Sequence, residues 1–293
     1  MHVARTSTAY GFKVASPAGD WPRIEALFRR GAELEVFTSA WTNDHLQLHG
    51  PTWDGLTELA ALAHLVPDHM IGHLVLATPF RHIAVIAKAA MVMDHATRGR
   101  FVLGLGVGSW PGDFEAYGIP LPSIGDRLRR FESELRVLHA LFGRSGARAG
   151  SGTLTLTEGP FRLSAVDFDP APFTPGGPPI WLGTQGERIG LRLAAQYADG
   201  WNFSAEGGFE AFQRKRGILR EHADRLGRDP ASLTVSAQFV VGDDLAALRD
   251  EVVRFVRAGC QHVIFYLDVE RGVPGLEAVA TDVAEAARDR LGA

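Results

Sequence analysis

The chain has 293 residues, of which 46% are hydrophobic and 22% charged, and its formal net charge is −4. This composition is that of a globular protein and excludes a disordered or fibrous chain. Because no long basic run is present, the charge does not indicate a basic surface that would bind nucleic acid or an anionic membrane.

The single cysteine, Cys260, excludes an internal disulfide and is typical of a reducing compartment. It precedes an apolar run, so we expect a small buried residue at the entry of a strand. The first twenty residues lack the apolar core of a signal peptide. No apolar stretch reaches the length of a membrane-spanning helix. These features predict a soluble, cytoplasmic protein that binds no membrane.

Short apolar runs alternate with amphipathic runs along nearly the whole chain. The apolar runs predict strands at 11–16, 35–41, 70–77, 101–110, 179–184, 200–203, 233–242 and 262–267. The amphipathic runs predict helices at 21–34, 54–66, 82–96, 126–142, 188–198, 209–227, 245–259 and 276–291. Alternation of this kind indicates a parallel sheet.

Eight strand–helix units in this length favour a closed (β/α)₈ TIM barrel over an open doubly wound sheet, with residues 1–293 as a single domain. Residues 143–178 interrupt the pattern and are rich in Gly, Pro, Ser and Thr. We interpret them as an insertion between the fourth helix and the fifth strand. Such insertions commonly lie at the active-site face, so we expect a lid over a substrate pocket.

The fourth strand reads FVLGLGVGSW and carries Gly104, Gly106 and Gly108 on one face, since strand side chains alternate. The spacing does not match the G-x-G-x-x-G turn of dinucleotide-binding folds, and we expect no helix to start at Pro111. Two interpretations stay open. The glycines open a slot at the barrel mouth for a flat ring, or they complement large neighbours inside the barrel.

Polar residues follow two other strands. Asn43, Asp44 and His45 come after the second strand, where a barrel enzyme keeps its site. The turn GTQGERIG at 183–190 leads into a helix N-terminus, which favours an anion, although an ordinary capped turn is the alternative. A flat slot, a hydrogen-bonding cluster and an anion cradle together suit a planar cofactor that carries a phosphate.

These segments also resemble the luciferase-like flavin- and deazaflavin-dependent oxidoreductases. The most typical run is AKAAMVMDHATRGRFVLGLGVGSWPGDFEAYGI at 87–119, and a second is PPIWLGTQGERIGLRLAAQYADGWNF at 178–203. SAWTNDHL and VLATPFRHIAVIAKAA match the family at the second and third strands. The resemblance covers roughly residues 10–270. It implies a (β/α)₈ barrel with an insertion, a small-molecule substrate and a homodimer.

The resemblance also implies a cofactor. It favours the deazaflavin F420, used for hydride transfer to or from a small organic substrate. The alternatives are an FMN-dependent monooxygenase and a non-catalytic flavin-binding member of the family. In the deazaflavin branch an Asp–His pair after the second strand lies against the ring, and Asp44 and His45 match it. The backbone after the third strand lies under the ring, often through a non-proline cis peptide, and the matching residues are Leu74, Val75 and Leu76.

The remaining cofactor positions that the resemblance implies are Gly106, Gly108, Ser109, Gly183, Thr184, Gln185 and Gly186. His45 is the candidate proton donor or acceptor, because an imidazole exchanges protons readily near neutral pH. Asp44 is expected to hydrogen-bond the ring or to orient His45. Asp113 lies later than the acidic residue that the sugar-phosphate branch carries after these glycines, so we assign it no role.

The sequence gives less support to metal-dependent or Schiff-base chemistry. No H-E-x-x-H or C-x-x-C spacing predicts a metal site, and we expect His69 and His73 to be solvated or core residues. The charges at 127–136 are expected to form a solvated helix face. A Schiff-base aldolase needs a lysine at a strand end. Of the three lysines only Lys13 falls in a predicted strand, at its middle.

Overall fold

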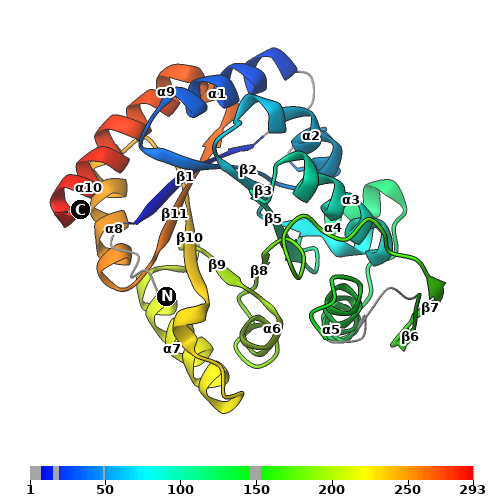
Figure 1. The fold of residues 1–293 in the computed structure, drawn as a ribbon. Coiled ribbons are helices and arrows are strands. Elements are labelled where there is room, and N and C mark those ends of the chain that lie inside the picture. The colour runs from blue at the N-terminus through cyan, green and yellow to red at the C-terminus, as the bar shows by residue number, and fades with distance from the viewer. Residues whose placement is uncertain (1–7, 16–19, 49, 146–152, 293) are drawn as a thin grey trace.

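A computed structural model describes residues 8–15, 20–48, 50–145 and 153–292. Its main sheet is a closed parallel barrel (Figure 1). The strands are β1 (Ala9–Ala15), β2 (Phe37–Thr42), β3 (Met70–His73) with its continuation β4 (Leu76–Ala77), β5 (Phe101–Gly106), β8 (Ile180–Gly183), β9 (Gly200–Ser204), β10 (Thr234–Val240) and β11 (His262–Asp268). Parallel pairing of β11 with β1 closes the ring. The predicted (β/α)₈ TIM barrel is confirmed.

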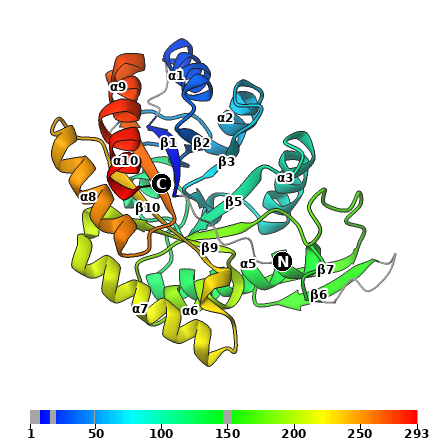
Figure 2. The ribbon, with the colours of Figure 1, turned by 60° about the vertical axis from the view of Figure 1, so that its left-hand side comes forward.

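Helices surround the barrel, as Figures 1 and 2 show from two directions. They are α1 (Trp21–Glu33), α2 (Gly55–Leu62), α3 (Ile83–Ala96), α4 (Pro111–Tyr117), α5 (Ile124–Leu141), α6 (Gly190–Tyr197), α7 (Phe209–Arg225), α8 (Leu245–Arg257), α9 (Gly272–Ala278) and α10 (Ala286–Leu291), with a π-helical segment at Val279–Glu285. The expectation that no helix starts at Pro111 is wrong, because proline suits the first turn of α4. Within the described ranges, no helix combines the length and apolarity needed to cross a membrane.

Two tryptophans fill the inside of the barrel. The rings of Trp41 and Trp181 lie 5.1 Å apart, and both side chains are buried. A Cβ atom on Gly72 or on Gly200 would lie 2.6 Å from one of these rings, so glycine at both positions is what admits the indoles. The two indole rings therefore fill the barrel interior between its two ends.

The glycines of β5 have a related role. A Cβ atom on Gly104 would lie 1.8 Å from the carbonyl oxygen of His73, and one on Gly106 would lie 2.5 Å from Val75 Cγ2. Between β3 and β4 the chain forms a bulge whose Leu74–Val75 peptide is cis, as the resemblance implies. Gly104 and Gly106 thus make room for a neighbouring segment, as the second interpretation expects, and the slot for a ring stays a prediction.

The predicted insertion forms a hairpin outside the barrel. Strands β6 (Leu154–Glu158) and β7 (Phe161–Val166) pair antiparallel and lie beside α5 in both views (Figures 1 and 2). The Phe161 ring contacts the guanidinium of Arg130 on α5 and the ring of His82. None of the described residues of 143–178 lines the cavities at the barrel mouth. The expected lid is therefore wrong for this part of the chain.

Candidate active site

Two neighbouring cavities lie at the carboxyl ends of the strands, and together they are called the hollow. The first has a volume of about 390 Å³ and lies on the side of β1 and β2. The second, of about 540 Å³, lies above α5 and the turn after β8. They share the wall residues Leu74, Val75, Val107, Gly108, Ser109, Gly183, Ser204 and Gln238. Barrel enzymes keep their sites at this face, so the hollow is the candidate active site.

His45 lines the first cavity and is paired with a carboxylate. Its Nδ1 lies 2.7 Å from Oδ2 of Asp113, whose side chain is only 2% exposed. Because an ionised carboxylate only accepts hydrogen bonds, Nδ1 carries a proton and Nε2 is left to exchange one. Nε2 has no hydrogen bond to any residue that the structure describes. This arrangement is that of an oriented general acid or base.

Asp113 is the site residue that the sequence reasoning set aside. It lies in the first turn of α4, and its Oδ1 accepts hydrogen bonds from the backbone N–H groups of Leu46 and Gln47, at 2.9 and 2.7 Å. The carboxylate therefore fixes both the ring and the loop that carries it. The local signal for this residue was Trp-Pro-Gly-Asp, with proline at the first helical position and an acid in the first turn.

Asp44 does not orient His45, so that one of its two predicted roles is wrong, and the hydrogen bond to a ring stays a prediction. Its carboxylate forms a two-pronged pair with Arg81, at 2.6 and 3.0 Å, and accepts hydrogen bonds from the backbone of Ala77 and Gly55. The Asp44 side chain is fully buried although the residue borders the first cavity. Its four contacts tie the loop after β2 to β4, α2 and Arg81. We expect a positioning role, since a saturated carboxylate has little capacity left to move protons.

The strand-end residues lie at the hollow with one exception. Leu74 and Val75 line both cavities, and Gly106 lines the first. Leu76 is fully buried in the outer core and lines neither. The bulge breaks the alternation of β3 and β4. The neighbours Leu74 and Val75 therefore both face the mouth, and Leu76 faces the helices. The predicted position of Leu76 under a ring is therefore wrong.

The second cavity has a cationic wall. It contains Thr184, Gln185 and Gly186, as the sequence predicted, and also Arg127 of α5. Arg127 donates from Nη1 to the carbonyl oxygens of Val107 and Gly108, and its buried Nε has no partner among the described residues. The expectation that the charges at 127–136 form a solvated face is wrong for this residue. Helical periodicity alone does not predict that Arg127 faces the cavity, because this placement depends on where β5 ends.

Polar groups from the far side of the barrel complete the first cavity. Lys13, Gln238 and Tyr266 belong to β1, β10 and β11, and Glu206 follows β9. Asn43 donates a hydrogen bond to the Tyr266 hydroxyl oxygen at 3.2 Å. Burial raises the pKa of Tyr266 to about 12, so this phenol stays protonated. The sequence reasoning assigned none of these four wall residues to the site.

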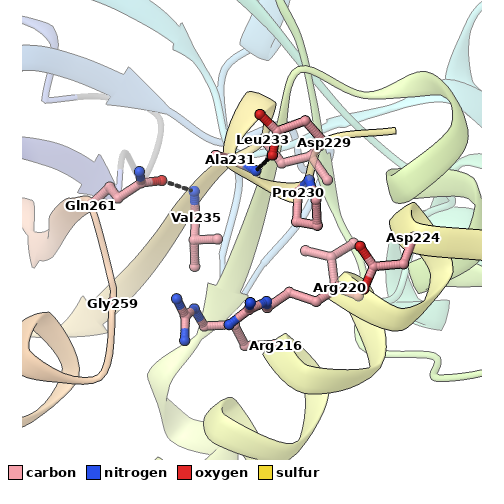
Figure 3. Close-up of a pocket in the computed structure, with 11 residues that line it drawn as sticks. Arg216, Arg220, Asp224, Asp229, Pro230, Ala231, Leu233, Val235, Gly259 and Gln261 are labelled. Carbon is pink, nitrogen blue, oxygen red and sulfur yellow. Dashed lines mark hydrogen bonds between the residues drawn. The ribbon is translucent and has the colours of Figure 1, made fainter. Parts of the chain in front are cut away.

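A third cavity, of about 420 Å³, lies at the opposite end of the barrel (Figure 3). Arg216 and Arg220 of α7 reach towards it, and the segments that lead into β10 and β11 form the other wall, including Leu233 and Gln261. Gln261 Oε1 accepts a hydrogen bond from the backbone N–H of Val235. In barrel folds this amino-terminal face serves stability, and we do not assign the reaction to it.

The fold and the paired imidazole at its mouth define a (β/α)₈ barrel protein with a candidate acid–base site at the carboxyl ends of its strands. Comparison with known proteins identifies the family. The model of the luciferase-like monooxygenase family matches residues 6–290. This chain belongs to the luciferase-like monooxygenase family.

A phthiodiolone/phenolphthiodiolone dimycocerosates ketoreductase of Mycobacterium bovis is 31% identical over 222 residues. The match covers 68% of this chain and 55% of the relative, so it spans about half of the relative's length. Two solved structures share the fold. An F420-dependent secondary alcohol dehydrogenase in complex with an F420-acetone adduct has a TM-score of 0.79 at 17% identity, covering 97% and 100% of the two chains. A monooxygenase from Streptomyces bottropensis has a TM-score of 0.68 at 18% identity, covering 97% and 88%.

Proposed function

We propose that this protein is an F420-dependent oxidoreductase that interconverts a ketone and its secondary alcohol by hydride transfer. The observation that carries the proposal is the His45–Asp113 pair in a cavity beside the bulge. The relative named as a ketoreductase and the neighbour named as an F420-dependent alcohol dehydrogenase support the choice of cofactor and substrate.

The residues of the hollow fit a planar cofactor with an anionic tail. Leu74, Val75 and the backbone of Gly106 and Gly108 would hold the ring, with Ser109 and Gly183 at its edge. The tail would meet Thr184, Gln185 and Gly186 and the guanidinium of Arg127, whose unpartnered Nε needs an acceptor. When bound, F420 supplies the site that gives or takes a hydride.

The protein's own part is proton exchange and position. His45 Nε2 would give a proton to the ketone oxygen during reduction and take it back during oxidation, while Asp113 stabilises the charged imidazole. Asp44 and Arg81 would hold the loop that carries His45. The walls of Leu74, Val75 and Phe80 would keep water from the reacting carbon.

The direct test is a fluorescence titration of the purified protein with F420 and, separately, with FMN. We expect F420 to bind and FMN to bind much more weakly, and the loaded enzyme to reduce ketones with reduced F420. Binding of FMN alone would favour the second candidate, a flavin-dependent monooxygenase, which the neighbour titled a monooxygenase supports. F420 binding without turnover on any ketone or alcohol would favour a non-catalytic member. A homodimer stays a prediction, to be checked by sedimentation.

A further inference from the structure

Lys13 is a buried amine inside the barrel mouth. The residue is 3% exposed and lies on β1, and it forms part of the wall of the first cavity together with His45. Its Nζ donates to the carbonyl oxygen of Leu74 at 2.5 Å and to Gln238 Oε1 at 3.1 Å. The amine also lies over the Tyr266 ring, 4.1 Å from its centre. Within the described residues no carboxylate forms an ion pair with it.

Such a residue is costly to the fold. An ammonium group removed from water without a counter-ion is strongly disfavoured, and an apolar side chain would fill the same space at no such cost. Burial lowers the pKa of Lys13 to about 7, although the charge of Glu206 acts to raise it. The titratable groups that border the same cavity are Glu206 and Tyr266 on its own side and Asp44, His45 and Asp113 across it.

The hydrogen-bond count of Lys13 leaves room for a ligand. An ammonium donates three hydrogen bonds, and the two acceptors Leu74 O and Gln238 Oε1 take two of them. These acceptors come from the bulge and from β10, on different sides of the amine, so they hold Nζ in a fixed position at the cavity wall. A fixed donor in a site closed to water stabilises negative charge far better than a mobile one in solvent.

We propose that Lys13 Nζ donates its third hydrogen bond to the substrate oxygen on the carbon that accepts or gives the hydride. The inference rests on the proposed function. During reduction, a hydride with its two electrons adds to the carbonyl carbon, and the C=O π pair moves onto oxygen. His45 Nε2 gives its proton to that oxygen, which completes the alcohol, while the cofactor is oxidised by two electrons. Lys13 keeps its proton throughout and holds the oxygen while negative charge develops there.

The test compares Lys13→Met, Lys13→Arg and the control Lys88→Met, whose exposed side chain lies outside the hollow. We expect all three to bind F420 within about 3-fold of the wild type. Lys13→Met should lower kcat for ketone reduction by about 10²-fold, the effect of losing one oxyanion donor. Lys13→Arg should keep more activity and hold it to higher pH, because an arginine does not deprotonate there.

Two further readouts separate this role from a structural one. The chain has three lysines, so ¹³Cε-lysine NMR gives three side-chain signals, and the one absent from Lys13→Arg should titrate near pH 7 in the wild type. The melting temperature of cofactor-free Lys13→Met at pH 7 should be no lower than that of the wild type. A residue needed only for folding would lower it.

Lys13→Met with wild-type kcat, or with lost F420 binding, overturns the role of Lys13 and leaves the proposed function standing. A wild-type enzyme that binds F420 but reduces no linear, cyclic or aryl ketone overturns the ketone assignment. If the wild-type protein does not bind F420, the proposed function is wrong, and the role of Lys13 inferred from it is wrong as well.

Discussion

Asp113 Oδ2 lies 2.7 Å from His45 Nδ1, so a carboxylate on α4 orients an imidazole on the loop after β2, 68 positions away in the chain. The same carboxylate accepts two backbone hydrogen bonds from the loop that carries the imidazole. A replacement that keeps an acceptor oxygen at position 113, such as Asp113→Asn, should therefore act on proton exchange while the loop keeps its two hydrogen bonds.

Asp113→Asn should lower kcat by about 10²-fold, which is within the range for a mispositioned general acid. The asparagine amide has no negative charge to stabilise the imidazolium, and it can donate to Nδ1, which favours a neutral ring whose Nε2 proton is much less acidic. Steady-state assays with reduced F420 measure the loss, and a fluorescence titration should show an unchanged Kd. Glu115→Gln, exposed on the same helix, is the matched control. An Asp113→Asn enzyme as fast as the control would remove Asp113 from the mechanism.

His45→Ala should lose about 10²- to 10⁴-fold in kcat and retain F420 binding, since in the proposed reaction the imidazole supplies the proton and forms no part of the anionic tail site. The exposed His64→Ala is the control, because among the described residues the partner of its ring is the nearby Ala61 carbonyl oxygen. Normal turnover by a His45→Ala protein that binds F420 would exclude the proton-transfer role.

Asp44→Asn should destabilise the protein by about 3 kcal/mol, because it leaves the mostly buried Arg81 guanidinium without its main partner. Asp54 also pairs with Arg81 but is 43% exposed, so Asp54→Asn should cost less than about 1 kcal/mol. Urea unfolding of the cofactor-free proteins measures both values. Equal and small losses would show that the Asp44–Arg81 pair does not anchor the loop.

The barrel was predictable because its signals are local. Alternating apolar and amphipathic runs depend on neighbours within one element, and eight such units leave few arrangements. Strand ends also collect at one face, which is why His45, Val75, Gly108 and Thr184 meet at the hollow although they are distant in sequence.

The errors arose where the chain departs from regular geometry or where contacts are long-range. The bulge before β4 reverses the facing of Leu76, which no alternation pattern anticipates. Asp113 acts through a loop from another strand, so its distance from the glycines in sequence was misleading. Lys13 falls within β1 and not at its end, and its role depends on how deep the cavity reaches into the barrel.

Arg127→Ala should weaken F420 binding by about 10- to 100-fold, the equivalent of one or two hydrogen bonds to a charged group. Arg127 and Gly186 both line the second cavity, so loss of the guanidinium should act on the anionic tail and leave kcat at saturating F420 little changed. Raising the salt concentration should weaken wild-type binding more than variant binding. Arg129→Ala, whose side chain is 75% exposed on the same helix, is the control. Identical Kd values for the two variants would place the tail elsewhere.

His73 gives a pH dependence of stability that is independent of the reaction. Its ring is fully buried and donates from Nε2 to the carbonyl oxygen of Gly55 at 3.0 Å. Burial lowers the pKa of His73 from 6.5 to about 4. Between these values the unfolded chain binds a proton that the folded chain does not, so the free energy of unfolding falls as the pH falls from 6.5 to 4. The contribution of neutral His73 to the free energy of unfolding is fully present above pH 6.5. Between pH 6.5 and pH 4 the protein loses on the order of 3 kcal/mol of this free energy.

His73→Gln keeps an N–H donor for Gly55 and removes the titration. Urea unfolding at intervals between pH 7 and pH 4 should therefore give a shallower slope for this variant than for the wild type, with the two curves converging or crossing at low pH. His64→Gln, at an exposed site, should follow the wild-type slope. If the His73→Gln and wild-type curves stay parallel through the window, the imidazole is accommodated in its charged form, and the burial of His73 does not set the acid sensitivity of this barrel.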